Sequence, residues 1–129
     1  MGMEFKFTKD NATPFIPINI NAQNAYVMLD TGASGSLLDS TFFQSLNKDY
    51  PLKDMAEVET ALSDEILAPV HELPFTLDGN LFFEDFTIVK LSGIINLEAD
   101  FKPIIGILGS SFFLKYKCIL DFKNLNFII

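Results

Sequence analysis

The chain of 129 residues has one cysteine, Cys118, one histidine, His71, and no tryptophan. A single cysteine cannot form an internal disulfide, so the fold does not depend on a disulfide framework. Cys118 and His71 alone provide too few ligands for a structural metal site. A single histidine without a serine or cysteine motif does not suggest a catalytic triad. We therefore expect no metal and no cofactor, and we interpret His71 as a strand or surface residue and Cys118 as a small core residue.

Positive charge is also scarce. Nine Lys and Arg face seventeen Asp and Glu, which gives a net charge of −8 and a pI near 4.4. Nucleic acids and anionic membranes repel such a chain at neutral pH, so we expect no nucleic-acid partner and substrates that are neutral or basic.

The N-terminal residues show no basic stretch followed by an apolar run. This predicts no signal peptide and no integral membrane segment. The expected location is cytoplasmic if the chain is complete, and periplasmic or exported if a leader was removed.

Hydrophobic residues make up 49% of the chain, with 14 phenylalanines, which is enough for one core, and we expect a single domain over 1–129. Alternating apolar residues and frequent turn signals predict an all-β fold. Expected strands or hairpin arms cover 5–7, 15–20, 25–29, 58–62, 66–68, 81–91, 104–108, 118–122 and 125–129.

Two short helices complete this prediction. The first includes Leu38, Phe42 and Leu46 and is capped by Asp39, Ser40 or Thr41, and the second covers 110–116 with a serine cap. A looser connection is expected from Ser92 to Pro103. The run 25–29 is continuously apolar, as in a strand buried on both faces.

Asp30 follows this apolar run and precedes Thr31-Gly32-Ala33-Ser34. A carboxylate at the end of a buried strand costs desolvation energy unless hydrogen bonds hold it, which suggests a chemical role. The alternatives are an ordinary strand-ending turn and a phosphate-binding loop, although the segment lacks the lysine and long helix of such a loop. A phosphotransferase nucleophile would need a parallel α/β sheet, and helices are scarce here.

The segment 27–34 resembles the active-site loop of the retropepsin-like aspartic peptidases. Further along, Ile104-Ile105-Gly106-Ile107-Leu108-Gly109 resembles the hydrophobic-hydrophobic-Gly segment behind that loop, and the helix that follows resembles the family's last helix. The resemblance covers Phe15 to the C-terminus. It implies a single-domain, bacterial-type member with a retropepsin-like acid-protease barrel, two short helices and one lobe per chain.

In this family two aspartates share one proton, and one activates a water while the other polarises the peptide carbonyl. Only Asp30 lies in an Asp-Thr-Gly motif, so the resemblance implies a homodimer that cleaves a peptide or protein substrate. By the same resemblance Thr31 braces the opposite loop, Gly32 lets the backbone approach the substrate, and Ala33 and Ser34 line the floor. The loop-supporting segment is Ile105, Gly106, Ile107, Leu108 and Gly109.

The hairpin from Val58 to Ala68 stands where the family has its flap, the hairpin that closes over bound peptide. Its expected turn is Ser63-Asp64-Glu65, and its glycine-free tip comprises Leu62, Ser63, Asp64, Glu65 and Ile66. The apolar chain ends are expected to pair across the dimer interface. Because fold does not fix function, the alternative is a catalytically silent peptide-binding or scaffold protein with the same fold.

Overall fold

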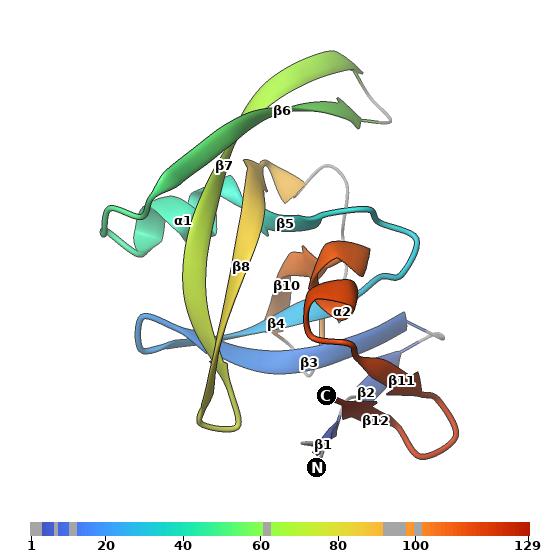
Figure 1. The fold of residues 1–129 in the computed structure, drawn as a ribbon. Helices are drawn as coiled ribbons and strands as arrows, with labels where there is room; N and C mark the ends of the chain where they lie inside the picture. Colours follow the sequence, from blue (N-terminus) through green and yellow to red (C-terminus); the bar gives the residue numbers. More distant parts are fainter. Residues whose placement is uncertain (1–3, 7, 11–12, 61–62, 92–97, 100–101) are drawn as a thin grey trace.

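The computed structural model describes residues 4–6, 8–10, 13–60, 63–91, 98–99 and 102–129. Over these residues the chain is mainly β, with two short helices, which confirms the predicted fold class (Figure 1). The elements are β1 (Glu4–Lys6), β2 (Thr8–Asp10), β3 (Thr13–Ile20), β4 (Gln23–Leu29), β5 (Ser36–Asp39), α1 (Ser40–Ser45), β6 (Leu52–Thr60), β7 (Ser63–Leu77), β8 (Asn80–Val89), β9 (Glu98–Ala99), β10 (Lys102–Leu108), α2 (Ser110–Lys115), β11 (Ile119–Asp121) and β12 (Asn126–Ile128).

A closed barrel forms the centre of the molecule. Its strands follow the order β3-β4-β10-β5-β8-β7, and β7 returns to β3 through the pair Asn19 and Thr76. Among the described residues, β2 extends this sheet beside β3, β6 extends it beside β7, and β9 pairs with β10. In Figure 1, β6 and the adjoining part of β7 extend beyond the barrel as a long hairpin.

The position of β10 decides where the candidate loop lies. β10 runs parallel to β4 and antiparallel to β5, and it lies between them in the sheet. β4 and β5 follow one another in the sequence, so the connection between them, 30–35, must pass over the end of β10. This crossing brings Asp30 against Leu108, and Ala33 and Gly35 against Gly109.

The core lies inside the barrel. Ile16, Ile18 and Ile20 are buried on one face of β3, as their alternation predicts. In β4, Val27 is fully buried, whereas Tyr26 is only partly buried. The prediction that this strand is buried on both faces was therefore wrong, because Asn24 is exposed and Tyr26 and Met28, on the same face, are only partly buried.

A cluster of aromatic side chains closes one end of the core. The fully buried ring of Phe112 on α2 lies 4.8 to 6.1 Å, centroid to centroid, from five other aromatic rings. These are the rings of Phe75, Phe82, Phe113, Tyr116 and Phe127. Aromatic pairs at this spacing attach α2 firmly to the barrel.

Both helices begin at an identifiable residue. The carboxylate of Asp39 accepts a hydrogen bond from the backbone N–H of Phe42 and caps α1, which confirms one of the three predicted caps. Leu38 belongs to β5 and not to the helix, because it pairs with Gly106 of β10. The predicted serine cap of α2 was wrong, since Gly109 is its N-cap without a side-chain hydrogen bond.

Two hairpins have tight turns of the kind that matches strand twist. Asn21 and Ala22 join β3 to β4 with φ of 49° and 67°, and Asp78 and Gly79 join β7 to β8 with φ of 48° and 80°. Positive φ at both central residues is characteristic of two-residue hairpin loops. The second turn confirms the turn predicted at 78–80.

The β6–β7 hairpin is present, but its turn is not where the sequence predicts it. Thr60 pairs with Ser63, so Ser63, Asp64 and Glu65 belong to β7. The connecting residues 61–62, including the predicted tip residue Leu62, lie outside the described residues. The strand pairing therefore continues through Ser63, Asp64 and Glu65, which the sequence predicts as a turn.

The looser connection predicted for 92–103 lies mostly outside the described residues. Within the part that the structure describes, Glu98 and Ala99 of β9 pair with Pro103 and Lys102 of β10. Cys118 directly precedes β11 and does not lie within that strand.

The two chain ends pair with each other. β12 lies between β1 and β11 in a second, three-stranded sheet, which Figure 1 shows below the barrel. These pairs form within one chain, and the pairing expected across a dimer interface stays a prediction. Among the described residues, no helix has both the length and the apolar character needed to cross a membrane.

Candidate active site

Asp30 directly follows β4, and the loop backbone holds its carboxylate. Its N–H donates to the carbonyl of Leu108 at 3.0 Å, which ties it to β10. Its Oδ1 accepts from the N–H of Gly32 at 2.9 Å, and its carbonyl accepts from Ala33 at 3.2 Å. Asp30 is partly buried, while Thr31 and Gly32 are exposed. The loop therefore presents a fixed carboxylate at the surface of the single chain.

The start of α2 supports the far side of this loop. The N–H groups of Ser110 and Ser111 donate to the carbonyls of Ala33 and Ser34 at 2.8 and 3.1 Å. The hydroxyl of Ser110, predicted as a helix cap, donates instead to the carbonyl of Ser34 at 3.2 Å. Three hydrogen bonds thus hold the carbonyls of Ala33 and Ser34 against the helix.

Two glycines of β10 and its end allow this close packing. A Cβ at Gly109 would lie 2.3 Å from the carbonyl oxygen of Gly35 and 2.8 Å from that of Ala33. A Cβ at Gly106 would lie 2.9 Å from the carbonyl oxygen of Leu37 in β5. The predicted loop-supporting segment, 105–109, therefore lies directly behind the loop, where a side chain at either glycine would displace backbone.

Sequence reasoning missed a buried polar network beneath the loop. Glu84 of β8 is 4% exposed and Ser36 is 1% exposed. The hydroxyls of Ser36 and Ser111 lie 2.8 and 2.9 Å from Glu84 Oε2, and Ser36 Oγ accepts from the N–H of Gly109 at 3.0 Å. One sequence signal could have found it, because Glu84 occupies the same face of β8 as the buried Phe82 and Phe86.

The other two reactive side chains, His71 and Cys118, pack against neighbouring residues away from the Asp30 loop. His71 Nδ1 lies 3.0 Å from the carbonyl oxygen of Tyr50, and its ring packs 4.8 Å from that of Phe43. Burial raises the pKa of the Cys118 thiol to about 12. Among the described residues, no group of three or more His, Cys, Asp or Glu could hold a metal ion.

The flap residues are only partly described. Val58 pairs with Ile66, which is exposed, and the register of the two arms shifts between this pair and the pair Thr60 and Ser63 nearer the tip. Leu62 lies outside the described residues, and Ser63, Asp64 and Glu65 are placed by their backbone alone.

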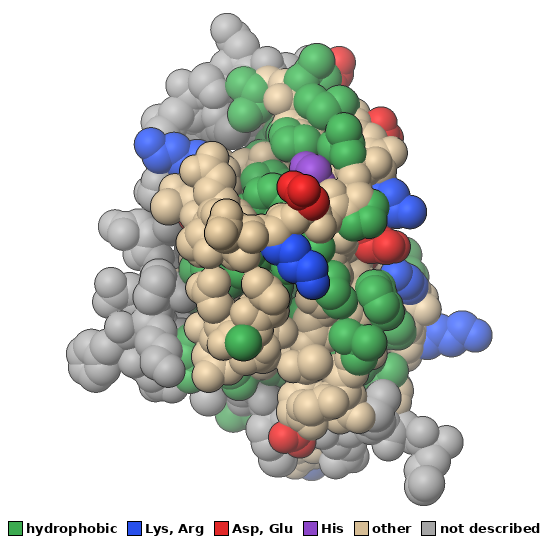
Figure 2. Space-filling view, turned by 90° about the vertical axis from the view of Figure 1, so that its left-hand side faces the viewer, with side chains coloured by type: hydrophobic (Ala, Val, Ile, Leu, Met, Phe, Trp, Pro, Cys, Tyr) green, Lys and Arg blue, Asp and Glu red, His purple; other side chains and the backbone are tan. Residues whose placement is uncertain are grey.

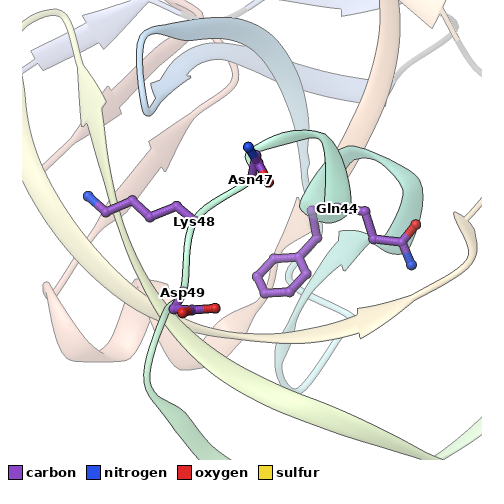
Figure 3. Close-up of a pocket in the computed structure, with 5 residues that line it drawn as sticks. Gln44, Asn47, Lys48 and Asp49 are labelled. Atoms are coloured by element: carbon purple, nitrogen blue, oxygen red, sulfur yellow. The ribbon is translucent and has the colours of Figure 1, made fainter.

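An open pocket of about 380 Å³ lies beside α1, away from the loop residues 30–34. Its lining residues are Phe43, Gln44, Asn47, Lys48 and Asp49. Figure 3 shows the Gln44 and Lys48 side chains extending in opposite directions, so their polar groups do not converge. Ligand sites usually have a few convergent polar groups, and this pocket is not a candidate site on that criterion.

The surface on the side of α1 mixes all types of side chain. Figure 2 shows hydrophobic side chains spread over it, with acidic and basic side chains between them. In the part of this face that described residues form, positive charge does not gather as it does on a nucleic-acid-binding surface.

Comparison with solved structures identifies the fold. The chain is similar to a retropepsin-like aspartic protease from Rickettsia conorii, with a TM-score of 0.65, 20% identity, and coverage of 99% of this chain and 90% of that one. It is similar to EIAV protease in complex with an inhibitor, with a TM-score of 0.62, 16% identity, and coverage of 88% and 99%. It is also similar to the retroviral protease-like domain of Ddi1 from Leishmania major, with a TM-score of 0.57, 17% identity, and coverage of 88% and 89%.

No family model and no curated protein matches the sequence. At these identities the solved structures establish the fold alone. The chain therefore has the retropepsin-like aspartic protease fold, which confirms the resemblance read from segments 27–34 and 104–109.

Proposed function

We propose that this protein is an aspartic endopeptidase, active as a homodimer in which each chain supplies one Asp30. The observation that carries the proposal is the carboxylate of Asp30, held by the N–H of Gly32 at the end of β4, in a chain with the retropepsin-like fold. A single carboxylate per chain cannot supply both the base and the acid, so a second copy completes the site.

The proposed chemistry uses a pair of aspartates that share one proton, because two close carboxylates do not both ionise cheaply. The ionised Asp30 removes a proton from a water, whose oxygen attacks the peptide carbonyl carbon. The protonated Asp30 of the second copy donates to the carbonyl oxygen as negative charge develops there. The Asp30 that took the proton from water then gives it to the amide nitrogen, while the Asp30 of the second copy takes a proton back from a hydroxyl of the intermediate. The C–N bond breaks and the pair is restored.

The remaining loop residues have supporting roles in this proposal. Thr31 is exposed in the single chain, which leaves it available to contact the opposite loop of a dimer. Gly32 keeps the backbone open to substrate, and Ala33 and Ser34 form the floor. The β6–β7 hairpin, including Leu62 and Ser63–Ile66, covers the bound peptide and excludes water.

The test is cleavage of an unfolded protein substrate between about pH 4 and pH 7, the range in which a shared-proton pair can work. We expect Asp30→Asn to abolish cleavage. The matched control is Asp78→Asn in the exposed β7–β8 turn, where asparagine suits the positive φ and cleavage should persist.

Mixing the two proteins tests the dimer. Excess Asp30→Asn chain should suppress wild-type activity, because mixed dimers contain only one Asp30. Undiminished cleavage would show that a chain cuts without a second Asp30. If wild type and variant are both inert while sedimentation shows a dimer, the proposal fails and the peptide-binding alternative replaces it.

A further inference from the structure

Glu84 is a buried carboxylate that the proposed reaction does not use. It lies in β8 on the face that otherwise buries Phe82 and Phe86, so an apolar residue is the ordinary expectation there. Burying an ionisable side chain costs free energy unless hydrogen bonds compensate. We therefore expect specific hydrogen bonds to compensate for the burial of Glu84.

The partners of Glu84 come from three separate elements. Oε2 accepts from the hydroxyl of Ser36, at the start of β5, and from the hydroxyl of Ser111, in the first turn of α2. Oε1 accepts from the N–H of Asp85 at 3.0 Å. An ionised carboxylate accepts hydrogen bonds only, and all three of these partners can donate.

Both serines connect to the active-site loop. Ser36 follows the loop, and its Oγ accepts from the N–H of Gly109, the residue on which the loop carbonyls pack. The N–H of Ser111 donates to the carbonyl of Ser34. Glu84 thus binds both serines through which the loop region is held, Ser36 at Gly109 and Ser111 at Ser34.

We propose that Glu84 is a positioning residue for the catalytic loop, which it holds in place through Ser36 and Ser111. The inference rests on the proposed aspartic peptidase function. In a dimeric site the two carboxylates must meet at a fixed separation, so a small shift of the loop in each chain changes the geometry of the pair. A misplacement of about 1 Å can lower a rate about 100-fold.

The central test compares Glu84→Leu with Glu84→Gln. Leucine removes every acceptor and leaves the buried hydroxyl of Ser36 and the hydroxyl of Ser111 without this partner, whereas glutamine keeps one oxygen for both serines and loses only the bond from Asp85. We expect kcat per titrated active site to fall about tenfold or more in Glu84→Leu, with KM nearly constant, and to fall less in Glu84→Gln.

Asp39→Asn is the matched control. Asp39 is also a carboxylate whose two oxygens accept from backbone N–H groups, but these belong to Phe42 in α1 and to Leu91 after β8. We expect this variant to lose stability and keep the wild-type kcat. An unchanged kcat in Glu84→Leu, or an equal fall in Glu84→Gln and Glu84→Leu, would overturn the proposal.

A readout without activity separates this inference from the proposed function. In Glu84→Leu, amide hydrogen exchange should accelerate at Gly109 and Ser111 and remain slow at Phe42 and Leu91, with the reverse pattern in Asp39→Asn. Equal acceleration at both places would show general destabilisation and overturn the positioning role. If Glu84→Leu does not fold, Ser111→Ala removes one of the two hydroxyls and should accelerate exchange at Gly109 more than at Phe42. If the wild-type protein proves inactive and Glu84→Leu still shows this exchange pattern, the role of Glu84 in holding the loop is supported and only the peptidase function is refuted.

Discussion

Replacement of Gly109 by alanine adds one methyl group where the active-site loop crosses the end of β10. The backbone of Gly109 has φ of −96° and ψ of −175°, an extended conformation that alanine adopts without strain. The effect of the substitution is therefore steric. The new Cβ would lie 2.3 Å from the carbonyl oxygen of Gly35, whereas ordinary contacts begin near 3.4 Å.

The loop must move by about 1 Å to relieve this contact, and the obstructing atoms belong to backbone. Overpacking of this kind costs about 1–3 kcal/mol. The movement also strains the two backbone hydrogen bonds from the N–H groups of Ser110 and Ser111 to the carbonyls of Ala33 and Ser34, each worth about 0.5–1.5 kcal/mol. We expect Gly109→Ala to lower the free energy of unfolding by about 2–6 kcal/mol and to reduce peptidase activity.

Urea unfolding measures the stability change, and the midpoint should fall by about 1 M or more. Gly35→Ala is the control, because a Cβ there meets nothing within 4 Å. It should leave stability unchanged or raise it by up to about 1 kcal/mol through reduced freedom of the unfolded chain. Equal midpoints for Gly109→Ala and Gly35→Ala would refute the steric argument.

Three further predictions concern the core, a helix cap and the thiol. Phe112→Ala should cost about 3–5 kcal/mol in denaturant unfolding, whereas Leu114→Ala on the exposed face of α2 should stay within about 0.5 kcal/mol, and similar losses would contradict this. Asp39→Ala should lower stability by about 1–2 kcal/mol through loss of the α1 cap, and an unchanged urea midpoint would refute that role. Burial raises the pKa of Cys118 to about 12, above the ordinary 9.0, so the unfolded state loses its proton first and stability should fall as pH rises above 9.0. The rate of alkylation of folded Cys118 by iodoacetamide should keep rising as the pH increases above 9.0, and a constant rate above pH 9.0 would refute the raised pKa.

Strand positions were largely predictable because their signal is local. The alternation at Ile16, Ile18 and Ile20 depends only on the two-residue period of a strand, and the structure buries all three. The Asp78-Gly79 turn was predictable for the same reason, since both residues accept positive φ.

Short elements with partners distant in sequence were not predictable in this way. β5 was hidden within the expected helix around Leu38, and it forms because Leu37 and Leu38 pair with Ile107 and Gly106 of β10. The turn expected at Ser63–Glu65 became strand because β6 pairs as far as Thr60. In both cases hydrogen bonds to another strand outweighed weak local preferences.

The amino-acid sequence by itself determined the all-β class, two helices, and a single Asp-Thr-Gly motif after an apolar strand, because side-chain periodicity and turn chemistry are properties of neighbouring residues. Tertiary structure decided that β10 lies between β4 and β5, which places Gly109 beneath the loop of Asp30. It also joined Glu84 to Ser36 and Ser111. These contacts link residues far apart in the chain, and only the order of strands in the barrel brings them together.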